Sequence, residues 1–221
     1  CARAQFARLV DNLTVFARRK ARKNGMMRAR PEGATPRDLD RRFSDPAWGN
    51  PPFVLLQQAF LAEDDVQVVA VCDVNAASAD YHQWSENEFR DAVRELLGTN
   101  SGWEWLSPNQ PLPLTHTMRV TSGVAGREPA QKIVNAYYGA KERSGSYRGC
   151  NAYRDFRELL ENERDLDAVV VGTPDHWHAA VSVAAMRKGK HVFCQKPMTH
   201  SIQEARRLGE VARETGVATQ V

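Results

Sequence analysis

The chain has 221 residues, 42% of them hydrophobic and 26% charged, which is enough apolar material for a globular core. No run of about eighteen apolar residues occurs, so we expect no membrane span, and the opening segment lacks the pattern of a signal peptide. The net charge of +3 is uneven: residues 1–62 hold 12 Lys and Arg against 5 Asp and Glu, giving +7, and the remainder carries −4.

Residues 1–52 are the first predicted unit, a basic N-terminal helix and a linker. Apolar residues at three- and four-residue spacing predict one amphipathic helix, on Phe6, Leu9, Val10, Leu13 and Phe16. The basic run at residues 18–23 is typical of a solvated helix face, and no motif supports nucleic acid binding. Residues 25–52 are rich in Arg, Pro, Gly and Asp without a sustained period, which indicates a linker.

Residues 53–221 are the second predicted unit, with an insertion at about residues 76–148. Residues 58–62 resemble the end of a helix, and residues 66–71 predict a strand that leads to Asp73.

Within the insertion, Ser85 and Glu88 form a capping-box pattern before a helix that Gly98 ends. The Ser-, Thr-, Pro- and Gly-rich sequence of residues 99–126 predicts a long loop.

The rest of the chain alternates predicted helices and strands. Helices are expected at residues 129–141, around residues 156–160, and at residues 178–188 and 201–216; strands are expected at residues 167–171, 191–194 and 217–221. Strand, helix, strand, helix, strand builds a parallel sheet through right-handed crossovers. The predicted fold class is therefore α/β, with nearly all-apolar strands covered on both faces.

Polar residues follow three of the predicted strands, where an open α/β sheet binds its ligands. Asp73 can accept hydrogen bonds from both ribose hydroxyls of a dinucleotide and would repel a 2′-phosphate, which favours NAD over NADP; an ordinary Asp-Asn turn with Asn75 is the alternative. No Gly-x-Gly-x-x-Gly precedes Asp73, so the usual pyrophosphate loop is missing.

The other two strand ends carry Thr173-Pro174 with His178, and Gln195-Lys196-Pro197. Lys196 can act as a general acid or base or donate to a substrate oxygen, and Pro197 restricts its backbone to extended conformations. From the sequence alone, an ordinary solvent-exposed lysine at a strand end is about as compatible with this pattern as a functional one. His176 and His178 without a third spaced ligand are weak grounds for a metal, and none is expected.

These motifs closely resemble the nucleotide-binding domain of the Gfo/Idh/MocA oxidoreductases, mostly sugar and inositol dehydrogenases, from about residue 58 onward. The resemblance implies that Thr173, Pro174 and His178 line the nicotinamide side of NAD, and that Lys196 contacts substrate and cofactor. Gln195 stands where the family most often has Glu. The implied cofactor-binding residues are Asp73, Asn75, Thr173, Pro174, His178, Gln195 and Lys196, with Lys196 also catalytic.

The domain departs from that family in two places. Its first strand and glycine loop are replaced, and no substrate domain follows Val221, so we expect an incomplete Rossmann-like sheet. Residues 38–56 resemble the N-terminal region of polyhydroxyalkanoate synthases, which suggests a chimeric reading frame joined near residues 54–59.

The predicted function is the NAD-binding domain of an oxidoreductase that acts on a sugar-like hydroxyl. An NAD-dependent glycosidase of the same family is a second hypothesis, and a fragment unable to bind cofactor, whose basic arm at residues 1–42 binds a partner, is a third. Four cysteines without Cys-x-x-Cys spacing favour a reducing compartment, and hence the cytoplasm. Association into a homo-oligomer stays open.

Overall fold

The computed structural model describes residues 13–19, 61, 66–83, 85–111, 121–141 and 147–221. Its main sheet consists of β1 (Leu13–Arg19), β2 (Val66–Cys72), β5 (Asn151–Tyr153), β6 (Ala168–Gly172), β7 (His191–Cys194) and β8 (Thr219–Gln220). The strands are ordered β5-β2-β1-β6-β7-β8. Counted along the chain within this sheet, that is the 3-2-1-4-5-6 order of dinucleotide-binding domains.

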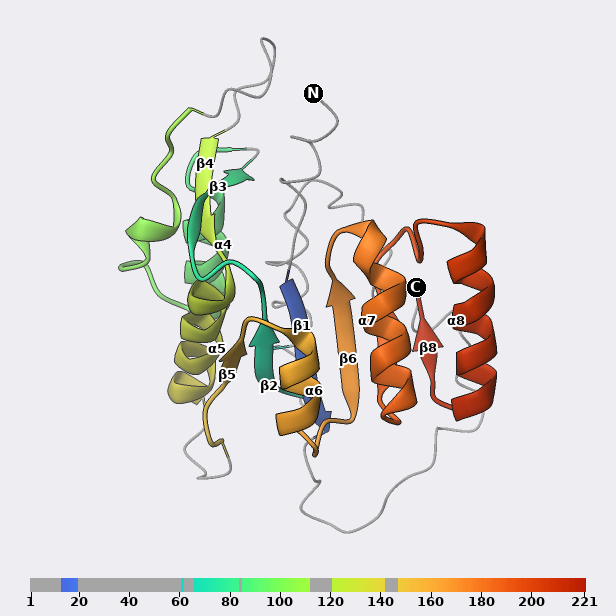
Figure 1. The fold of residues 1–221 in the computed structure, drawn as a ribbon. Helices are drawn as coiled ribbons and strands as arrows, with labels where there is room; N and C mark the ends of the chain where they lie inside the picture. Colours follow the sequence, from blue (N-terminus) through green and yellow to red (C-terminus); the bar gives the residue numbers. More distant parts are fainter. Residues whose placement is uncertain (1–12, 20–60, 62–65, 84, 112–120, 142–146) are drawn as a thin grey trace, which may run out of the picture.

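One strand of this sheet runs against the others. β2 pairs parallel with β5, and β6, β7 and β8 pair parallel in turn, but β1 is antiparallel to both β2 and β6. The arrow of β1 in Figure 1 points opposite to those of β2 and β6. Thr14, at the start of β1, lies opposite Cys72 and Val171, so the amino end of β1 reaches the edge where its neighbours finish.

The amphipathic helix predicted for the N-terminal segment is wrong over Leu13 and Phe16, which belong to β1. Residues 14–16 are Thr, Val and Phe, types that favour a strand, and apolar spacing over so short a run fits either structure. The vacant position between β2 and β6 decides the outcome, because a strand there satisfies the backbone groups of both neighbours.

Several predictions of the N-terminal third fall outside the described residues. These are Phe6, Leu9 and Val10 of the expected helix, most of the basic run, the linker, the synthase-like residues 38–56, and the helix end at residues 58–62 apart from helical Leu61.

The predicted helices of the C-terminal half are confirmed, as α5 (Arg127–Lys141), α6 (Phe156–Asn162), α7 (Asp175–Arg187) and α8 (Ile202–Thr215). The predicted capping box at Ser201 and Glu204 begins α8, and Gly216 ends it with φ 66°. α7 begins three residues before the predicted start, at Asp175. β8 keeps two residues of the strand expected over residues 217–221.

Side chains from both faces of the main sheet are buried, as the apolar strand sequences predict. Val170 of β6 belongs to a core that includes Ile133 and Val134 of α5, whereas Val169 and Val171 point into a second core with Val181 of α7 and Leu208 of α8. In Figure 1, α6 and α7 lie in front of the strands, and α4 and α5 lie beside β5 and β2. Two helical layers therefore hold the sheet.

A second sheet, which the sequence did not predict, follows β2. It pairs β3 (Ser78–Gln83) antiparallel with β4 (Thr121–Ala125) beside α4 (Glu88–Leu97) and a short 3-10 helix, η1 (Glu104–Leu106). The long loop predicted for residues 99–126 is therefore wrong where η1 and β4 form. Helix α4 ends at Gly98 as predicted, but Asn87 precedes it and makes no side-chain cap hydrogen bond. Of the predicted capping box, only the contact from the Ser85 N–H to the Glu88 carboxylate is present, at 3.4 Å.

Gln83 joins the parts of this small unit, although it is a fully buried polar residue. Its Oε1 accepts hydrogen bonds from the backbone N–H of Phe89 at 2.9 Å and from Ser107 Oγ at 2.6 Å. Its Nε2 donates to the carbonyl oxygen of Ser122 at 2.5 Å. Gly123 on β4 has to lack a Cβ, because one built there would lie 2.6 Å from the Phe89 ring.

Three cysteines, Cys72, Cys150 and Cys194, are buried free thiols. Burial is the main reason why the pKa of Cys72 and Cys150 rises to about 12 and that of Cys194 to about 11. Among the described residues, no helix combines the length and the apolar character that crossing a bilayer requires.

We predict that Gln83→Leu lowers the free energy of unfolding by about 3 kcal/mol, because it leaves buried donors and an acceptor without partners. Urea denaturation of the two proteins measures this difference. Gln203→Leu makes the same change at an exposed position on α8 and should shift stability by less than about 0.5 kcal/mol. Equal losses in both variants would contradict the structural role of Gln83.

Candidate functional site

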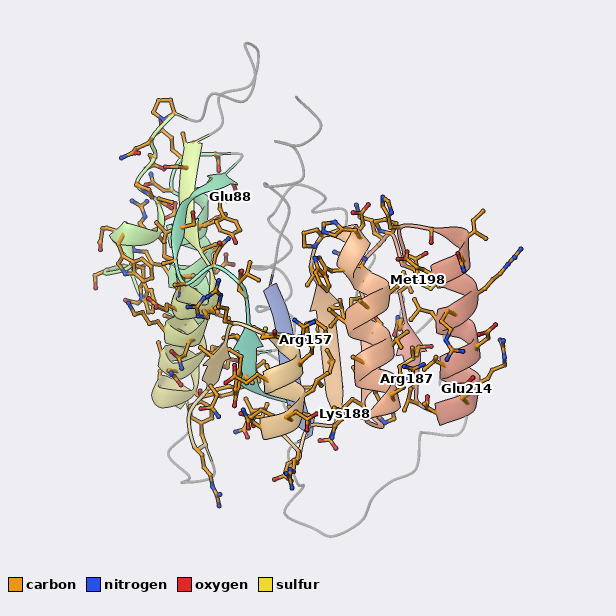
Figure 2. The ribbon with its side chains drawn as sticks, viewed as in Figure 1. Glu88, Arg157, Arg187, Lys188, Met198 and Glu214 are labelled. Atoms are coloured by element: carbon orange, nitrogen blue, oxygen red, sulfur yellow. The ribbon has the colours of Figure 1, made fainter. Side chains whose placement is uncertain are left out.

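Three strand ends of the main sheet point to the same edge. β2 leads to Asp73, β6 to Thr173 and β7 to Lys196, and β2, β6 and β7 run in the same direction. The N–H of Gln195 donates to the carbonyl oxygen of Val171 at 2.8 Å, so the turns after β6 and β7 start side by side. In Figure 2, Met198 lies at the end of α7 and α8 nearest the tip of β6, and Lys188 lies at the opposite end.

Asp73 is 2% exposed, and both of its carboxylate oxygens are engaged within the chain. Oδ1 accepts the N–H of Asn75 at 2.8 Å, and Oδ2 accepts the hydroxyl of Tyr81 at 3.3 Å. Burial raises the pKa of Asp73 to about 6, against the lowering effects of these two hydrogen bonds and of the Arg127 charge. The side chain of Asn75 also contacts the Tyr81 hydroxyl, at 3.1 Å, so Asn75 belongs to the same turn.

The turn after β2 is fastened to the start of α5. Arg127 Nη1 donates to the carbonyl oxygens of Asp73 at 3.2 Å and Val74 at 3.1 Å. Gly126, with φ 132°, allows this contact, since a Cβ there would lie 2.8 Å from the carbonyl oxygen of Ala76. The position of Asp73 therefore depends on the chain that follows β4.

Thr173 and Pro174 form the turn between β6 and α7. Pro174 precedes the first helical residue, and its carbonyl oxygen accepts the N–H of Trp177 at 2.8 Å. The hydroxyl oxygen of Thr173 is buried and makes no hydrogen bond. A buried hydroxyl without a partner is costly unless a ligand group supplies one.

His178 is 2% exposed on the first turn of α7. Its Nε2 lies 2.6 Å from the carbonyl oxygen of Thr173, and its Nδ1 lies 2.6 Å from the carbonyl oxygen of Pro197. Both ring nitrogens are therefore occupied by the backbone of the two turns.

Gln195 and Lys196 follow β7 in a turn where the Lys196–Pro197 peptide bond is cis. The Oε1 atom of Gln195 accepts the backbone N–H of Lys196 at 3.1 Å, so this side chain shapes the turn. Lys196 itself is exposed at the same edge of the sheet as Asp73 and Thr173. An exposed ammonium group on a fixed turn can donate to an oxygen of a bound molecule.

The nearby His176 contacts Asp175 at 3.8 Å, and both side chains are about half exposed. Among the described residues, no group of three or more His, Cys, Asp or Glu side chains is gathered as a metal site would require.

The residues fit the two ends of a dinucleotide unequally. At the β6 and β7 ends, the unpaired Thr173 hydroxyl and the exposed Lys196 offer hydrogen bonds to a nicotinamide group. At the β2 end, the carboxylate of Asp73 is already hydrogen-bonded on both oxygens. A loop that follows β1 would leave the opposite edge of the sheet, since β1 is antiparallel to β2 and β6, so the usual pyrophosphate loop has no place after it.

Two residues that shape the site were not predicted from the sequence, namely Tyr81 and Arg127. Tyr81 lies on a strand with few apolar residues, which gives no strong strand signal, and a tyrosine eight positions after an aspartate has no motif. The sequence signal for Arg127 was its place after Gly126, two positions before the helix predicted for residues 129–141.

Known proteins resemble part of this chain. Residues 118–221 match a family model described as an oxidoreductase family with an NAD-binding Rossmann fold. A 1,5-anhydro-D-fructose reductase of Ensifer adhaerens is 43% identical over 60 residues, which cover 27% of this chain and 18% of that protein. Glycosyl hydrolase family 109 protein 2 of Shewanella sp. (strain ANA-3) is 38% identical over 86 residues, which cover 39% of this chain and 18% of that protein.

Among solved structures, an NAD binding oxidoreductase from Klebsiella pneumoniae is 41% identical, with a TM-score of 0.31 over 32% of this chain and 19% of that chain. The chain spans about a fifth of the length of the curated relatives named above. The matched stretch contains Thr173, His178 and Lys196 and four of the six strands of the main sheet, β5 to β8. Residues 118–221 thus match the NAD-binding Rossmann domain of the Gfo/Idh/MocA oxidoreductase family.

Proposed function

We propose that this chain is part of an oxidoreductase that transfers a hydride between a nicotinamide cofactor and the carbon that bears a hydroxyl group of a sugar-like molecule. The family of residues 118–221 supports the cofactor, and the relative named as an anhydrofructose reductase supports the substrate class. The observation that carries the proposal is the buried, unpaired Thr173 hydroxyl beside the exposed Lys196 turn.

Each of these groups has a task in such a reaction. A bound nicotinamide would accept or return the hydride. Thr173 would donate to or accept from a polar group of the nicotinamide end, which removes the cost of its unpaired hydroxyl. Lys196 would hold the substrate oxygen by hydrogen bonding and exchange a proton with it. His178 and Pro174 would shape the wall of this region, and Gln195 would fix the backbone of Lys196.

We further propose NAD rather than NADP as the cofactor. The carboxylate of Asp73, with Asn75 in the same turn, would face the adenosine ribose and repel a 2′-phosphate. Its present hydrogen bond to Tyr81 would have to yield to a ribose hydroxyl. Residues 53–221 would act as the cofactor domain, with β1 from the N-terminal segment at the centre of its sheet. Buried free thiols support a reducing, cytoplasmic setting.

A glycosidase that uses NAD transiently is the second candidate, because a relative named as a glycosyl hydrolase matches 39% of the chain. The two reactions differ in their balance. A dehydrogenase accumulates NADH as it consumes sugar, whereas the glycosidase would release a sugar without net NADH.

We predict that the purified chain binds NADH saturably, and that Thr173→Val weakens this binding about three- to tenfold, through the loss of one hydrogen bond. Fluorescence titration measures the affinity. Stability in urea should stay equal or rise, because the hydroxyl has no partner in the absence of ligand.

The control is Thr219→Val, an exposed threonine on β8 that pairs with the start of β7, far along the strands from the site. This variant should bind NADH as the original chain does. No saturable binding at millimolar NADH would refute the cofactor proposal and favour a fragment unable to bind nucleotide.

A second prediction concerns Asp73. Its pKa is raised from 3.8 to about 6, so its protonated form stabilises the fold fully below about pH 4, and that contribution is lost as the pH rises through 6. Two pKa units correspond to about 3 kcal/mol. Asp73→Asn cannot ionise, so its unfolding free energy should fall less between pH 4 and pH 7.5, by up to about 3 kcal/mol.

Urea denaturation at a series of pH values tests this expectation. Asp91→Asn, at an exposed position on α4, should keep the pH dependence of the original chain. If Asp73→Asn and the original chain have parallel pH profiles, the carboxylate is not the buried acid that its surroundings indicate.

A further inference from the structure

His178 makes a contact that the proposed function does not use. Its imidazole ring lies between the turn after β6 and the turn after β7, with one nitrogen 2.6 Å from the Thr173 carbonyl oxygen and the other 2.6 Å from the Pro197 carbonyl oxygen. Pro197 directly follows Lys196. One buried side chain thus joins the turn with the unpaired hydroxyl to the turn with the proposed catalytic lysine.

Both partners of the ring are hydrogen-bond acceptors. A backbone carbonyl oxygen cannot donate, and a neutral imidazole has one N–H and one bare nitrogen. A neutral ring would therefore place a lone pair against a carbonyl oxygen at 2.6 Å on one side. Two favourable contacts at this distance require an N–H on each nitrogen, which is the imidazolium form.

Some features around the His178 ring disfavour a positive charge on it, and others stabilise that charge. The amino end of α7 disfavours a cation, and so does burial. Two short charge-assisted bonds offset these costs, and Asp175 places a carboxylate in the same first turn. Two neighbouring side chains can carry a positive charge, namely His176 beside the first turn and Lys196 in the second, and both are exposed to solvent.

The Lys196 turn has other contacts as well, including the hydrogen bond from the Lys196 N–H to Gln195 Oε1 at 3.1 Å. The Cys194 thiol lies 3.8 Å from the carbonyl oxygen of Met198, and the N–H of Gln195 donates to the carbonyl oxygen of Val171 on β6 where the turn begins. The contact from His178 reaches the residue after Lys196 from another element. Without it, Pro197 would lose this hydrogen bond to α7.

We infer that His178 is a positioning residue that holds the Lys196 turn in place by donating hydrogen bonds from both ring nitrogens. The inference rests on the proposed function only in that Lys196 is the group whose place it fixes. His178 touches neither cofactor nor substrate in this role. Its two bonds set the separation between the Thr173 and Lys196 turns.

The test is nitrogen-15 NMR of the full chain with labelled histidine, near pH 7 and without cofactor. The expected spectrum has one histidine whose two ring nitrogens both carry a proton, and this pair of signals is absent from His178→Gln. A single protonated nitrogen for His178 would overturn the inference. The variant is needed only to assign the signals to His178. Selective labelling of the original chain can provide the same assignment, so the measurement does not require that the variant is stable.

Backbone amide exchange gives a second readout. In His178→Gln, the amides of Gln195 and Lys196 should exchange about tenfold faster, because the turn loses its link to α7. His176→Gln, an exposed histidine two positions earlier, is the matched control and should leave both rates unchanged. Unchanged rates in His178→Gln would contradict the positioning role.

Neither measurement involves a nucleotide. A doubly protonated ring together with no NADH binding would reject the proposed function alone, and NADH binding with a singly protonated ring would reject this inference alone.

Discussion

The centre of the main sheet depends on the pairing of β1 with β2 on one side and with β6 on the other. Among the residues that the structure describes, no other strand connects the β5–β2 pair to the three strands β6, β7 and β8 by hydrogen bonds. Because β1 fills the central position, β2 and β6 lie one strand apart, and the ends that carry Asp73 and Thr173 lie along the same edge. The reversed direction of β1 leaves this arrangement intact and changes only which of its own ends reaches that edge.

The C-terminal half was largely predictable because its local and long-range signals agree. Ser201 and Glu204 form the capping box that they suggest, and Gly216 takes the left-handed conformation that ends α8. The β-branched run of β6 is buried on both faces, as an apolar strand in a parallel sheet should be. Where propensity, capping and burial favour the same element, the sequence is a sufficient guide.

The segments between β2 and α5 and before β2 were harder to predict, for different reasons. β3 is stabilised by Gln83, a residue type that is expected at the surface. In the folded chain its side chain is hydrogen-bonded to five partners, which the sequence does not reveal. β1 has a sequence compatible with helix or strand, and its pairing with two strands far along the chain, β2 and β6, decides between them. Likewise, the hydrogen bonds of Asp73 to Tyr81 and of His178 to Pro197 cannot be read from spacing.

The chemical reactivity of the three buried thiols can report local motion at and away from the site. Cys72 and Cys194 end β2 and β7, directly before Asp73 and Gln195, whereas Cys150 precedes β5. A thiol with a pKa near 11 or 12 reacts slowly with alkylating reagents, since little thiolate is present and the sulfur is covered. The alkylation rate of Cys72 or Cys194 therefore reports how often the end of β2 or β7 beside the site opens. The rate at Cys150 reports the same for the chain that leads into β5.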